Sequence, residues 1–262
     1  MEWYEALILG LVQGFTEFLP VSSSGHLELG NALLKIQTGE NLTFAVVVHG
    51  ATVLSILIVF FKEIKSLLAD SLQFRWNEST KYLGKILFSL IPVILIGLFF
   101  RDQVESLFTG NILLVGSMLL VTAALLIIAG RKAPGTRNIS WMHSFIIGIA
   151  QAVAVLPGLS RSGATITTGL LLGNKRDEVT RFSFLMVLIP VIGINLLDLL
   201  TGDLKSENAI GWGPLLIGFL SALISGLIAC NWMIAIVRKG KLIWFGLYCL
   251  IIGTVAIVTS LF

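Results

Sequence analysis

Two segments of this 262-residue sequence combine charged and hydroxyl side chains with glycine inside otherwise apolar surroundings. Residues 13–26 read QGFTEFLPVSSSGH, and residues 157–165 read PGLSRSGAT. Together they supply a carboxylate at Glu17, an imidazole at His26, a guanidinium at Arg161 and several hydroxyls. This set suits phosphoryl chemistry, in which a protein neutralises charged oxygens and places a nucleophile in line with the bond that breaks. A guanidinium in particular binds phosphate oxygens in a bidentate manner.

The serines and glycines of both segments precede short helical patterns. Ser24-Gly25 and Ser162-Gly163 stand where each helix is expected to begin, so hydroxyls and unpaired backbone N–H groups lie at the positive end of a helix dipole. Such an end binds anions. Ser/Gly turns that only cap broken helices are the alternative. The candidate substrate-binding residues are Gln13, Ser22, Ser24, Gly25, Ser160, Ser162, Gly163 and Thr165.

Composition places these segments in a membrane protein. Apolar residues make up 56 % of the chain and charged residues 13 %, against about 25 % in an ordinary soluble domain, and the mean hydropathy is +0.93. The net charge of +3 comes from short basic clusters between apolar runs, which argues against a nucleic-acid-binding face. Cys230 and Cys249 lie in apolar segments without CxxC spacing, so we expect packing or lipid-facing residues. The first basic residue is Lys35, so no cleavable signal peptide is expected.

The charged residues of the two segments also have structural alternatives. A charge at membrane depth costs about 2.5 to 3.5 kcal/mol on insertion scales and marks a functional site by default. A structural ion pair between Glu17 and Arg161 stays open, as does a satisfied interior histidine at His26. His49, inside an apolar stretch, is more often a packing residue than a ligand.

Six apolar stretches are long enough to cross about 30 Å of hydrocarbon at 1.5 Å per residue. Four shorter apolar pieces form two pairs, each broken by a Pro/Gly/Ser turn, and this pattern predicts re-entrant helix-turn-helix hairpins shielded by protein. The predicted transmembrane helices are 43–61, 83–100, 111–129, 182–200, 213–236 and 242–262. The predicted re-entrant pairs are 3–19 with 26–36 and 144–157 with 163–173.

Basic residues assign a side of the membrane to each connection, because short cytoplasmic loops carry the excess of Lys and Arg. The basic segments are 62–82 (taken with Lys85), 130–143, 174–181 and 237–241. The segments with at most one basic residue are 37–42, 101–110, 201–212 and the C-terminal end. The two sets alternate along six spans only if each broken pair returns to the side it entered. We therefore expect a multi-pass protein with both termini outside, and a long loop at 62–82.

The two halves of the chain repeat one another. A shift of 138 residues aligns the Gly-x-x-Gln and Ser-x-Ser-Gly patterns of the first half with those of the second, beginning with Gly10 on Gly148. Near the ends of the halves the shift becomes 130. Each half has an odd number of spans, so the second is upside down, which gives an all-α integral membrane domain, 1–262, with inverted topology. We expect the first repeat at 1–130, the second at 140–262, and the two turns near the midplane.

The reactive groups do not follow this repeat. Under the shift of 138 residues, Glu17 falls on Val155 and His26 on Ala164. A symmetric scaffold with an asymmetric set of reactive groups favours an enzyme. A transporter or lipid flippase, which also uses inverted repeats with broken helices, is the alternative.

At these residues the sequence resembles the undecaprenyl-diphosphate phosphatase family of the bacitracin-resistance type. The resemblance covers essentially the whole chain and is carried by the segments 13–26 and 157–165. The family has Glu or Gln at the position of Gln13, which leaves Glu17 as the only carboxylate of that pair. The resemblance implies hydrolysis of a polyprenyl diphosphate to the monophosphate and phosphate at the outer side of the cytoplasmic membrane. This reaction recycles the lipid carrier used in peptidoglycan synthesis and gives resistance to bacitracin.

The resemblance also implies roles for individual residues. Arg161, the neighbouring hydroxyls and two helix N-termini would hold the phosphates. Glu17 would act as a base or a metal-bound group, and His26 as an acid, a base or a covalent acceptor, while Ser23, His26 and water stay open as the nucleophile. The family implies Mg²⁺ or Ca²⁺, which we expect to arrive with the diphosphate because the sequence has no multi-carboxylate cage; no organic cofactor is expected. The polyprenyl tail stays among membrane lipids, and a homodimer is expected by analogy alone.

Overall fold

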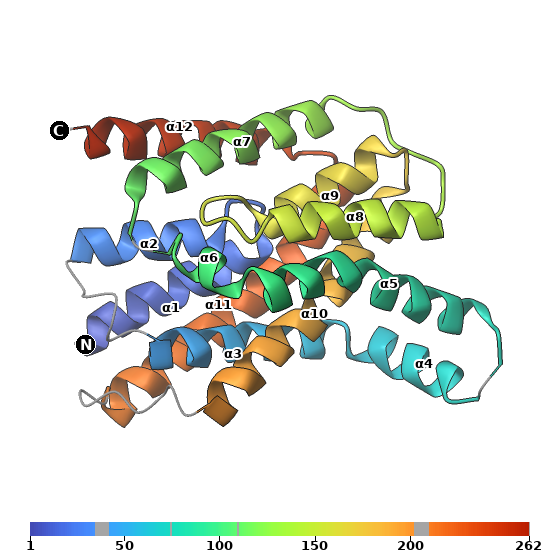
Figure 1. The fold of residues 1–262 in the computed structure, drawn as a ribbon, viewed down its shortest axis with the longest axis horizontal. Helices are drawn as coiled ribbons and strands as arrows, with labels where there is room; N and C mark the ends of the chain where they lie inside the picture. Colours follow the sequence, from blue (N-terminus) through green and yellow to red (C-terminus); the bar gives the residue numbers. More distant parts are fainter. Residues whose placement is uncertain (35–41, 74, 109, 202–209, 262) are drawn as a thin grey trace.

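The protein is described by a computed structural model in which all regular structure is helical (Figure 1). The described residues are 1–34, 42–73, 75–108, 110–201 and 210–261. Their helices are α1 (Trp3–Phe18), α2 (Ser23–Leu34), α3 (Leu42–Val59), α4 (Phe61–Ser71), α5 (Glu78–Phe99), α6 (Arg101–Glu105), α7 (Ile112–Gly130), α8 (Trp141–Val153), α9 (Arg161–Leu171), α10 (Arg176–Thr201), α11 (Trp212–Arg238) and α12 (Ile243–Ser260). Outside the described residues lie 35 and 36 of the predicted second helix, most of the predicted external segments 37–42 and 201–212, and residue 262.

Four of these helices, α5, α7, α11 and α12, are long and apolar enough to cross a membrane. A fifth span is added if α3 and α4 count as one, although the chain bends by 73° between them. The protein is therefore a multi-pass membrane protein. The four helices cover the predicted spans 83–100, 111–129, 213–236 and 242–262, the last up to Ser260. The predicted spans 43–61 and 182–200 lie mainly in α3 and in α10, and a total of six crossings stays a prediction.

Two pairs of shorter helices break where the sequence predicts turns. α1 packs against α2, and α8 packs against α9. α1 ends at Phe18 because Leu19, which precedes Pro20, is held in an extended conformation. The four predicted short helices are present, and the return of each pair to the side it entered stays a prediction.

The second helix of each pair begins two or three residues earlier than predicted. α2 starts at Ser23 and α9 at Arg161. Both helices start early because a serine caps each of them. The hydroxyls of Ser22 and Ser160 accept hydrogen bonds from backbone N–H groups three residues further on, at 3.3 and 3.0 Å. Ser23 and Arg161 thus stand on the first turn of a helix rather than in a loop.

The segment 62–82 was expected to be a loop, and this prediction is wrong because most of it is helical, in α4 and in the first turn of α5. The segment is polar enough for a loop, but its apolar residues Phe61, Ile64, Leu67 and Leu68 recur at helical spacing. Ile64 and Leu67 pack against the apolar core. α4 and α5 form a hairpin in which α5 packs along α8, whereas α4 lies at the edge of the molecule and packs mainly on α5 (Figure 1).

Glycines let the helices of the two halves approach closely. A Cβ atom on Gly10 of α1 would lie 2.6 Å from the Gly218 carbonyl oxygen of α11, and one on Gly14 would lie 2.5 Å from that of Ala222. Gly148 of α8 meets the backbone of α5 in the same way. Small residues permit this closeness between membrane helices. Each of the short helices α1 and α8 is therefore held by a long helix of the other half.

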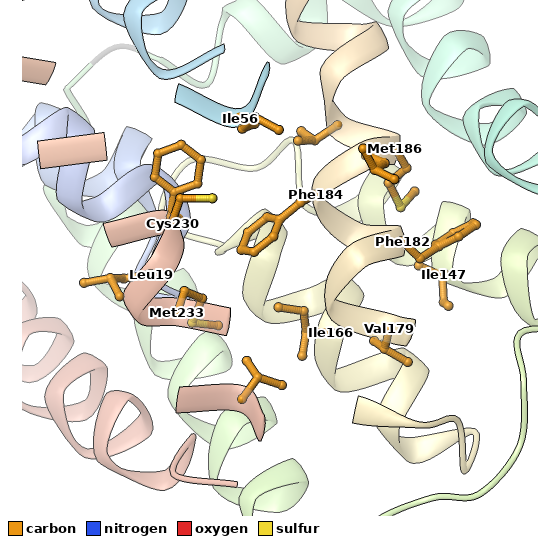
Figure 2. Packing of buried hydrophobic residues seen from close by; sticks show 14 of the residues in the cluster. Leu19, Ile56, Ile147, Ile166, Val179, Phe182, Phe184, Met186, Cys230 and Met233 are labelled. Carbon is orange, nitrogen blue, oxygen red and sulfur yellow. The ribbon is translucent and has the colours of Figure 1, made fainter. Parts of the chain in front are cut away.

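The largest buried apolar cluster draws residues from most of the helices, with α10 as the largest contributor (Figure 2). At its centre Phe184 lies edge-on to Phe18, with ring centroids 6.0 Å apart. Cys230 and Cys249 are free and fully buried, so they are packing residues and the lipid-facing alternative is wrong. Since Phe18 is the last residue of α1, this cluster packs directly behind the end of the helix that carries Glu17.

Candidate active site

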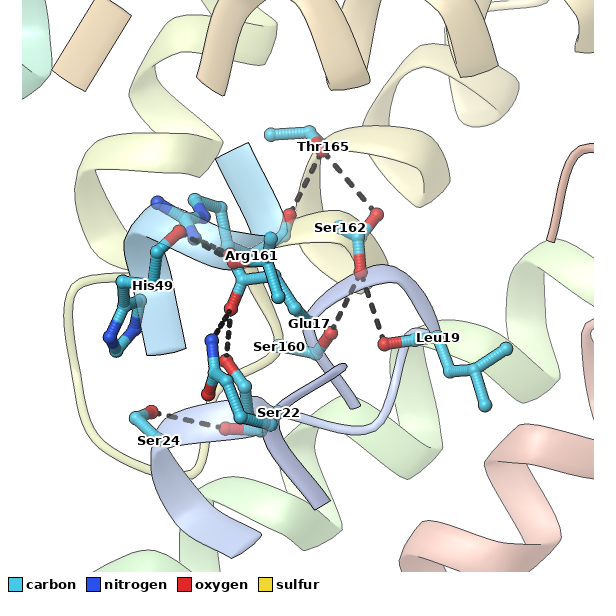
Figure 3. A network of polar contacts seen from close by, with 12 residues as sticks. Glu17, Leu19, Ser22, Ser24, His49, Ser160, Arg161, Ser162 and Thr165 are labelled. Atoms are coloured by element: carbon cyan, nitrogen blue, oxygen red, sulfur yellow. Dashed lines mark hydrogen bonds and ion pairs between the residues drawn. The ribbon is translucent and has the colours of Figure 1, made fainter. Parts of the chain in front are cut away.

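Glu17 is the centre of a polar network that joins the two turns (Figure 3). One carboxylate oxygen, Oε1, forms an ion pair with Nη2 of Arg161. The other, Oε2, accepts hydrogen bonds from Ser23 Oγ at 2.7 Å and from Gln13 Nε2 at 3.1 Å. The Glu17 side chain is 5 % exposed and that of Arg161 is 29 % exposed, so the guanidinium is the more accessible half of the pair.

Local structure explains how the first turn brings these groups together. Gln13 and Glu17 are four residues apart on α1, so their side chains share one helix face. After Pro20 the chain reverses, and Ser22 adopts φ +70°, a left-handed conformation that a residue with a side chain rarely takes. This reversal places Ser23 against Glu17, six residues earlier in the chain. Backbone strain of this kind clusters at functional sites.

The second turn is held by α7. The hydroxyl of Thr122 donates to the Gly158 carbonyl at 3.2 Å and accepts from the Ser160 N–H at 3.0 Å. Gly158 has φ +90°, and a Cβ atom there would collide with the Val115 carbonyl oxygen, so the turn requires glycine. These contacts fix the start of α9 and with it the position of Arg161.

The two turns touch each other directly. Ser162 Oγ donates to the Leu19 carbonyl at 3.3 Å, and a Cβ atom on Gly25 would lie 3.0 Å from Gly158 Cα. Each turn also contains the same pair of hydroxyls in contact at 3.3 Å. The pairs are Ser22 with Ser24 and Ser160 with Ser162. The serine and glycine residues predicted for substrate binding therefore lie at one junction between α1, α2 and α9.

Two of the predicted residues form their hydrogen bonds away from Glu17. Thr165 Oγ1 donates to the Arg161 carbonyl at 2.9 Å, a bond within its own helix. His26 follows Ser23 by three residues on α2, and its ring nitrogens contact the Ser22 carbonyl and Tyr248 Oη, each at 2.8 Å. The structure thus brings Gln13, Glu17, Ser23 and Arg161 into direct contact, and it joins His26 to them only through α2.

Three further residues near this network were missed or set aside by sequence reasoning. Tyr248 of α12 contacts His26, but it belongs to no motif and lies 222 positions away. Ser183 of α10 has a buried Oγ with no hydrogen-bond partner in the described part of the chain. It lines a cavity of about 10 Å³ together with Glu17 and Arg161, which is room for about one water. His49 of α3 lies close enough to interact electrostatically with Glu17 (Figure 3). For His49 and Ser183 the available signal was a polar residue inside an apolar helix.

The residues of this network offer few ligands for a divalent cation. Among the described residues there is no group of three or more His, Cys, Asp and Glu side chains that could hold a metal. Glu17 is the single carboxylate of the network, and both of its oxygens are engaged by Arg161, Ser23 and Gln13. These residues do not form a metal cage, which would need several free oxygen ligands.

What the arrangement can do chemically follows from its contacts. A serine hydroxyl donating to a carboxylate is the geometry of a nucleophile beside its base. An arginine, two helix N-termini and a set of hydroxyls beside that pair form a site for phosphate oxygens. Both features lie at the junction of the two turns.

Comparison with known proteins identifies relatives over the full length. Residues 6–255 match the family described as Bacitracin resistance protein BacA. A protein of Bacteroides fragilis named undecaprenyl-diphosphatase is 53 % identical over 99 % of both chains. Proteins of the same name from Parabacteroides distasonis and Halothermothrix orenii are 52 % and 37 % identical, each over at least 99 % of both chains. With its polar motifs gathered at one junction of a helical membrane protein, the chain belongs to the bacitracin resistance protein BacA family.

Proposed function

We propose that this protein is an undecaprenyl-diphosphate phosphatase, a hydrolase that releases phosphate from the lipid diphosphate and leaves the lipid monophosphate. The reaction returns the carrier lipid to peptidoglycan synthesis and confers resistance to bacitracin. The observation that carries the chemistry is the contact of Ser23 with Glu17, whose other oxygen pairs with Arg161. The name printed for the relatives at 53 % and 52 % identity supports the substrate.

The proposed reaction begins when Arg161, the hydroxyls and the two helix N-termini bind the diphosphate. Arg161 then turns from Glu17 to the phosphate oxygens, which frees Glu17 to accept a proton. The oxygen of Ser23, or of a water in its place, attacks the terminal phosphorus as its proton passes to Glu17. The bond from this phosphorus to the bridging oxygen breaks, and the lipid monophosphate leaves with a proton from His26 or solvent.

The fate of the phosphoryl group depends on the nucleophile. If Ser23 attacks, a water subsequently cleaves the phosphoserine bond and releases phosphate; if water attacks, phosphate forms in one step. The contact with Glu17 favours Ser23 or a water at its position over His26, whose ring nitrogens bond elsewhere. No step passes through a metal. We propose that any Mg²⁺ or Ca²⁺ enters with the diphosphate as part of the substrate.

We further propose an inverted repeat of 1–130 and 140–262, with six spans and two re-entrant pairs. The pairing of α1 with α11 and of α8 with α5 supports it, as do the matching hydroxyl pairs in the two turns. In this topology both termini lie outside, and the site opens to the outer side of the cytoplasmic membrane while the polyprenyl tail stays among the lipids. Homodimer formation stays a prediction, measurable as the mass of the detergent-solubilised particle.

The test is phosphate release from undecaprenyl diphosphate by the purified protein in detergent. Glu17→Gln and Arg161→Ala should each lower turnover by about 10² or more, because each removes a charged group that acts in the reaction. The exposed residues Glu78 and Arg131 supply the matched controls Glu78→Gln and Arg131→Ala, which should turn over like the native chain. A native protein that releases no phosphate, with or without added Mg²⁺ or Ca²⁺, would falsify the proposal.

A further inference from the structure

Tyr248 of α12 meets His26 in two ways at once. Its hydroxyl lies 2.8 Å from His26 Nε2, and the two rings are stacked, with centroids 5.6 Å apart and planes 11° apart. Parallel stacking and an edge hydrogen bond together fix both the position and the rotation of the imidazole. Neither contact is explained by capping or by the apolar core.

The other ring nitrogen determines which tautomer these contacts hold. His26 Nδ1 lies 2.8 Å from the Ser22 carbonyl oxygen, which can only accept, so Nδ1 carries the hydrogen. In a neutral imidazole Nε2 is then the acceptor, and the Tyr248 hydroxyl donates to it. The pair therefore keeps the lone pair of Nε2 aimed at a phenol O–H.

Tyr248 is itself held firmly against the first turn. The next residue, Cys249, is fully buried and donates from Sγ to the Pro20 carbonyl at 3.8 Å. α12 also packs closely on α7, where a Cβ atom on Gly253 would lie 2.9 Å from the Gly116 carbonyl oxygen. This close approach of α12 to α7, together with the contact of Cys249 with the first turn, places the phenol beside His26.

The corresponding place in the second half shows what the scaffold alone requires. The shift of 138 residues puts His26 on Ala164, and the shift of 130 puts Tyr248 on Met118. Ala164 and Met118 belong to one apolar cluster. Packing at this position is thus satisfied by an apolar pair in one half, whereas the other half has an imidazole and a phenol.

We propose that Tyr248 is a positioning residue for His26. It holds the Nδ1–H tautomer through its hydroxyl, which donates to Nε2 of the neutral imidazole and accepts from Nε2–H once His26 is protonated. In the reaction Nε2 takes up a proton from solvent and gives it to the bridging oxygen as the lipid monophosphate leaves. This inference rests on the proposed phosphatase function and adds a residue from α12 to its site.

The first test is nitrogen-15 NMR of histidine-labelled protein in detergent, without substrate. His26→Gln identifies the His26 signals. The native chain should show neutral His26 with hydrogen on Nδ1, and Tyr248→Phe, which keeps the stacked ring, should shift the population toward the Nε2–H form. A native protein with hydrogen on Nε2 overturns the proposal whatever its activity, and this result does not depend on a variant that folds.

The second test is turnover of undecaprenyl diphosphate. Tyr248→Phe should lower kcat on the order of tenfold with KM changed less than about twofold, because the lost contact acts on proton transfer rather than on binding. The control is Tyr82→Phe, since the buried Tyr82 hydroxyl has no partner among the described residues and its removal breaks no hydrogen bond. Native turnover by Tyr248→Phe overturns the positioning role while leaving the phosphatase standing; an inactive native chain overturns the phosphatase itself.

Discussion

At the scale of single residues, the resting site is held by competition for Glu17. Arg161 occupies one of its oxygens, and Ser23 with Gln13 occupies the other. A buried ion pair is costly to break from one side, because the remaining charge is left without a partner. An incoming phosphate can replace Glu17 as the partner of Arg161, so the charged substrate itself makes the rearrangement possible. The buried carboxylate then has a hydroxyl as its nearest hydrogen-bond donor.

Ser23→Ala tests that hydroxyl. Removing the Oγ atom that donates to Glu17 should lower kcat by about 10² to 10⁴, because a nucleophile or the group that positions a water is lost. Phosphate release by the purified variant measures this loss. Ser117→Ala on the surface of α7, where the hydroxyl bonds only within its own helix, should behave like the native chain. Turnover of Ser23→Ala within twofold of native would exclude both roles for Ser23.

At the scale of helices, the site depends on close packing between the short and long helices. The position of α1 on α11 is set by glycines that allow backbone contact. A glycine of α8, Gly148, allows the same close contact with the backbone of α5. Because Glu17 is on the last turn of α1, a small displacement of this helix moves the carboxylate relative to Arg161.

Gly10→Ala should therefore destabilise the protein and impair turnover together. The new Cβ atom would lie 2.6 Å from the Gly218 carbonyl oxygen, and overpacking of this kind costs about 1–3 kcal/mol. The unfolding temperature in detergent measures the effect. Gly97→Ala is the control, since a Cβ atom there meets nothing within 4 Å, and alanine in a helix is slightly stabilising. Equal unfolding temperatures for the two variants would contradict the packing account.

At the scale of the whole molecule, the likeness of the two turns contrasts with the unequal distribution of charged residues between them. Both turns have the same serine capping and the same hydroxyl contact. Only one half contributes Glu17 and His26, and only the other contributes Arg161. A carrier that opens alternately to the two sides of a membrane needs two similar conformations. A hydrolase needs one set of reactive groups in one place, and the distribution of charged residues fits a hydrolase.

The proposed topology is tested by cysteine labelling. The native cysteines are buried, so they give little background with a membrane-impermeant maleimide. Leu261→Cys, exposed after α12, should be labelled in intact cells, because an even number of crossings with both termini outside places it there. Gln73→Cys, exposed after α4 in the basic segment, should be labelled only after permeabilisation. The reverse pattern would invert the topology and place the site on the other side.

The sequence by itself determined the class of protein and supplied the candidate reactive groups. The long apolar segments and the low content of charged residues identify a membrane protein, because neither property depends on how the chain folds. Glu17, Ser23 and Arg161 were identifiable because charges and hydroxyls inside apolar sequence are costly unless they are used. The start of α2 was missed because serine capping is a small local effect, and the helix α4 was missed because its many polar residues resemble a loop although its apolar residues recur at helical spacing.

Only the tertiary structure decided which of these groups meet. Glu17 and Arg161 are 144 residues apart, and no spacing rule predicts that they meet. They are brought together by the glycine contacts of α1 with α11 and by the hydrogen bonds of α7 to the second turn. Tyr248 had no signal in the sequence, because an exposed tyrosine in an apolar helix is ordinary until another element places a histidine beside it. Local patterns record what a residue can do, whereas long-range packing decides with which partner it acts.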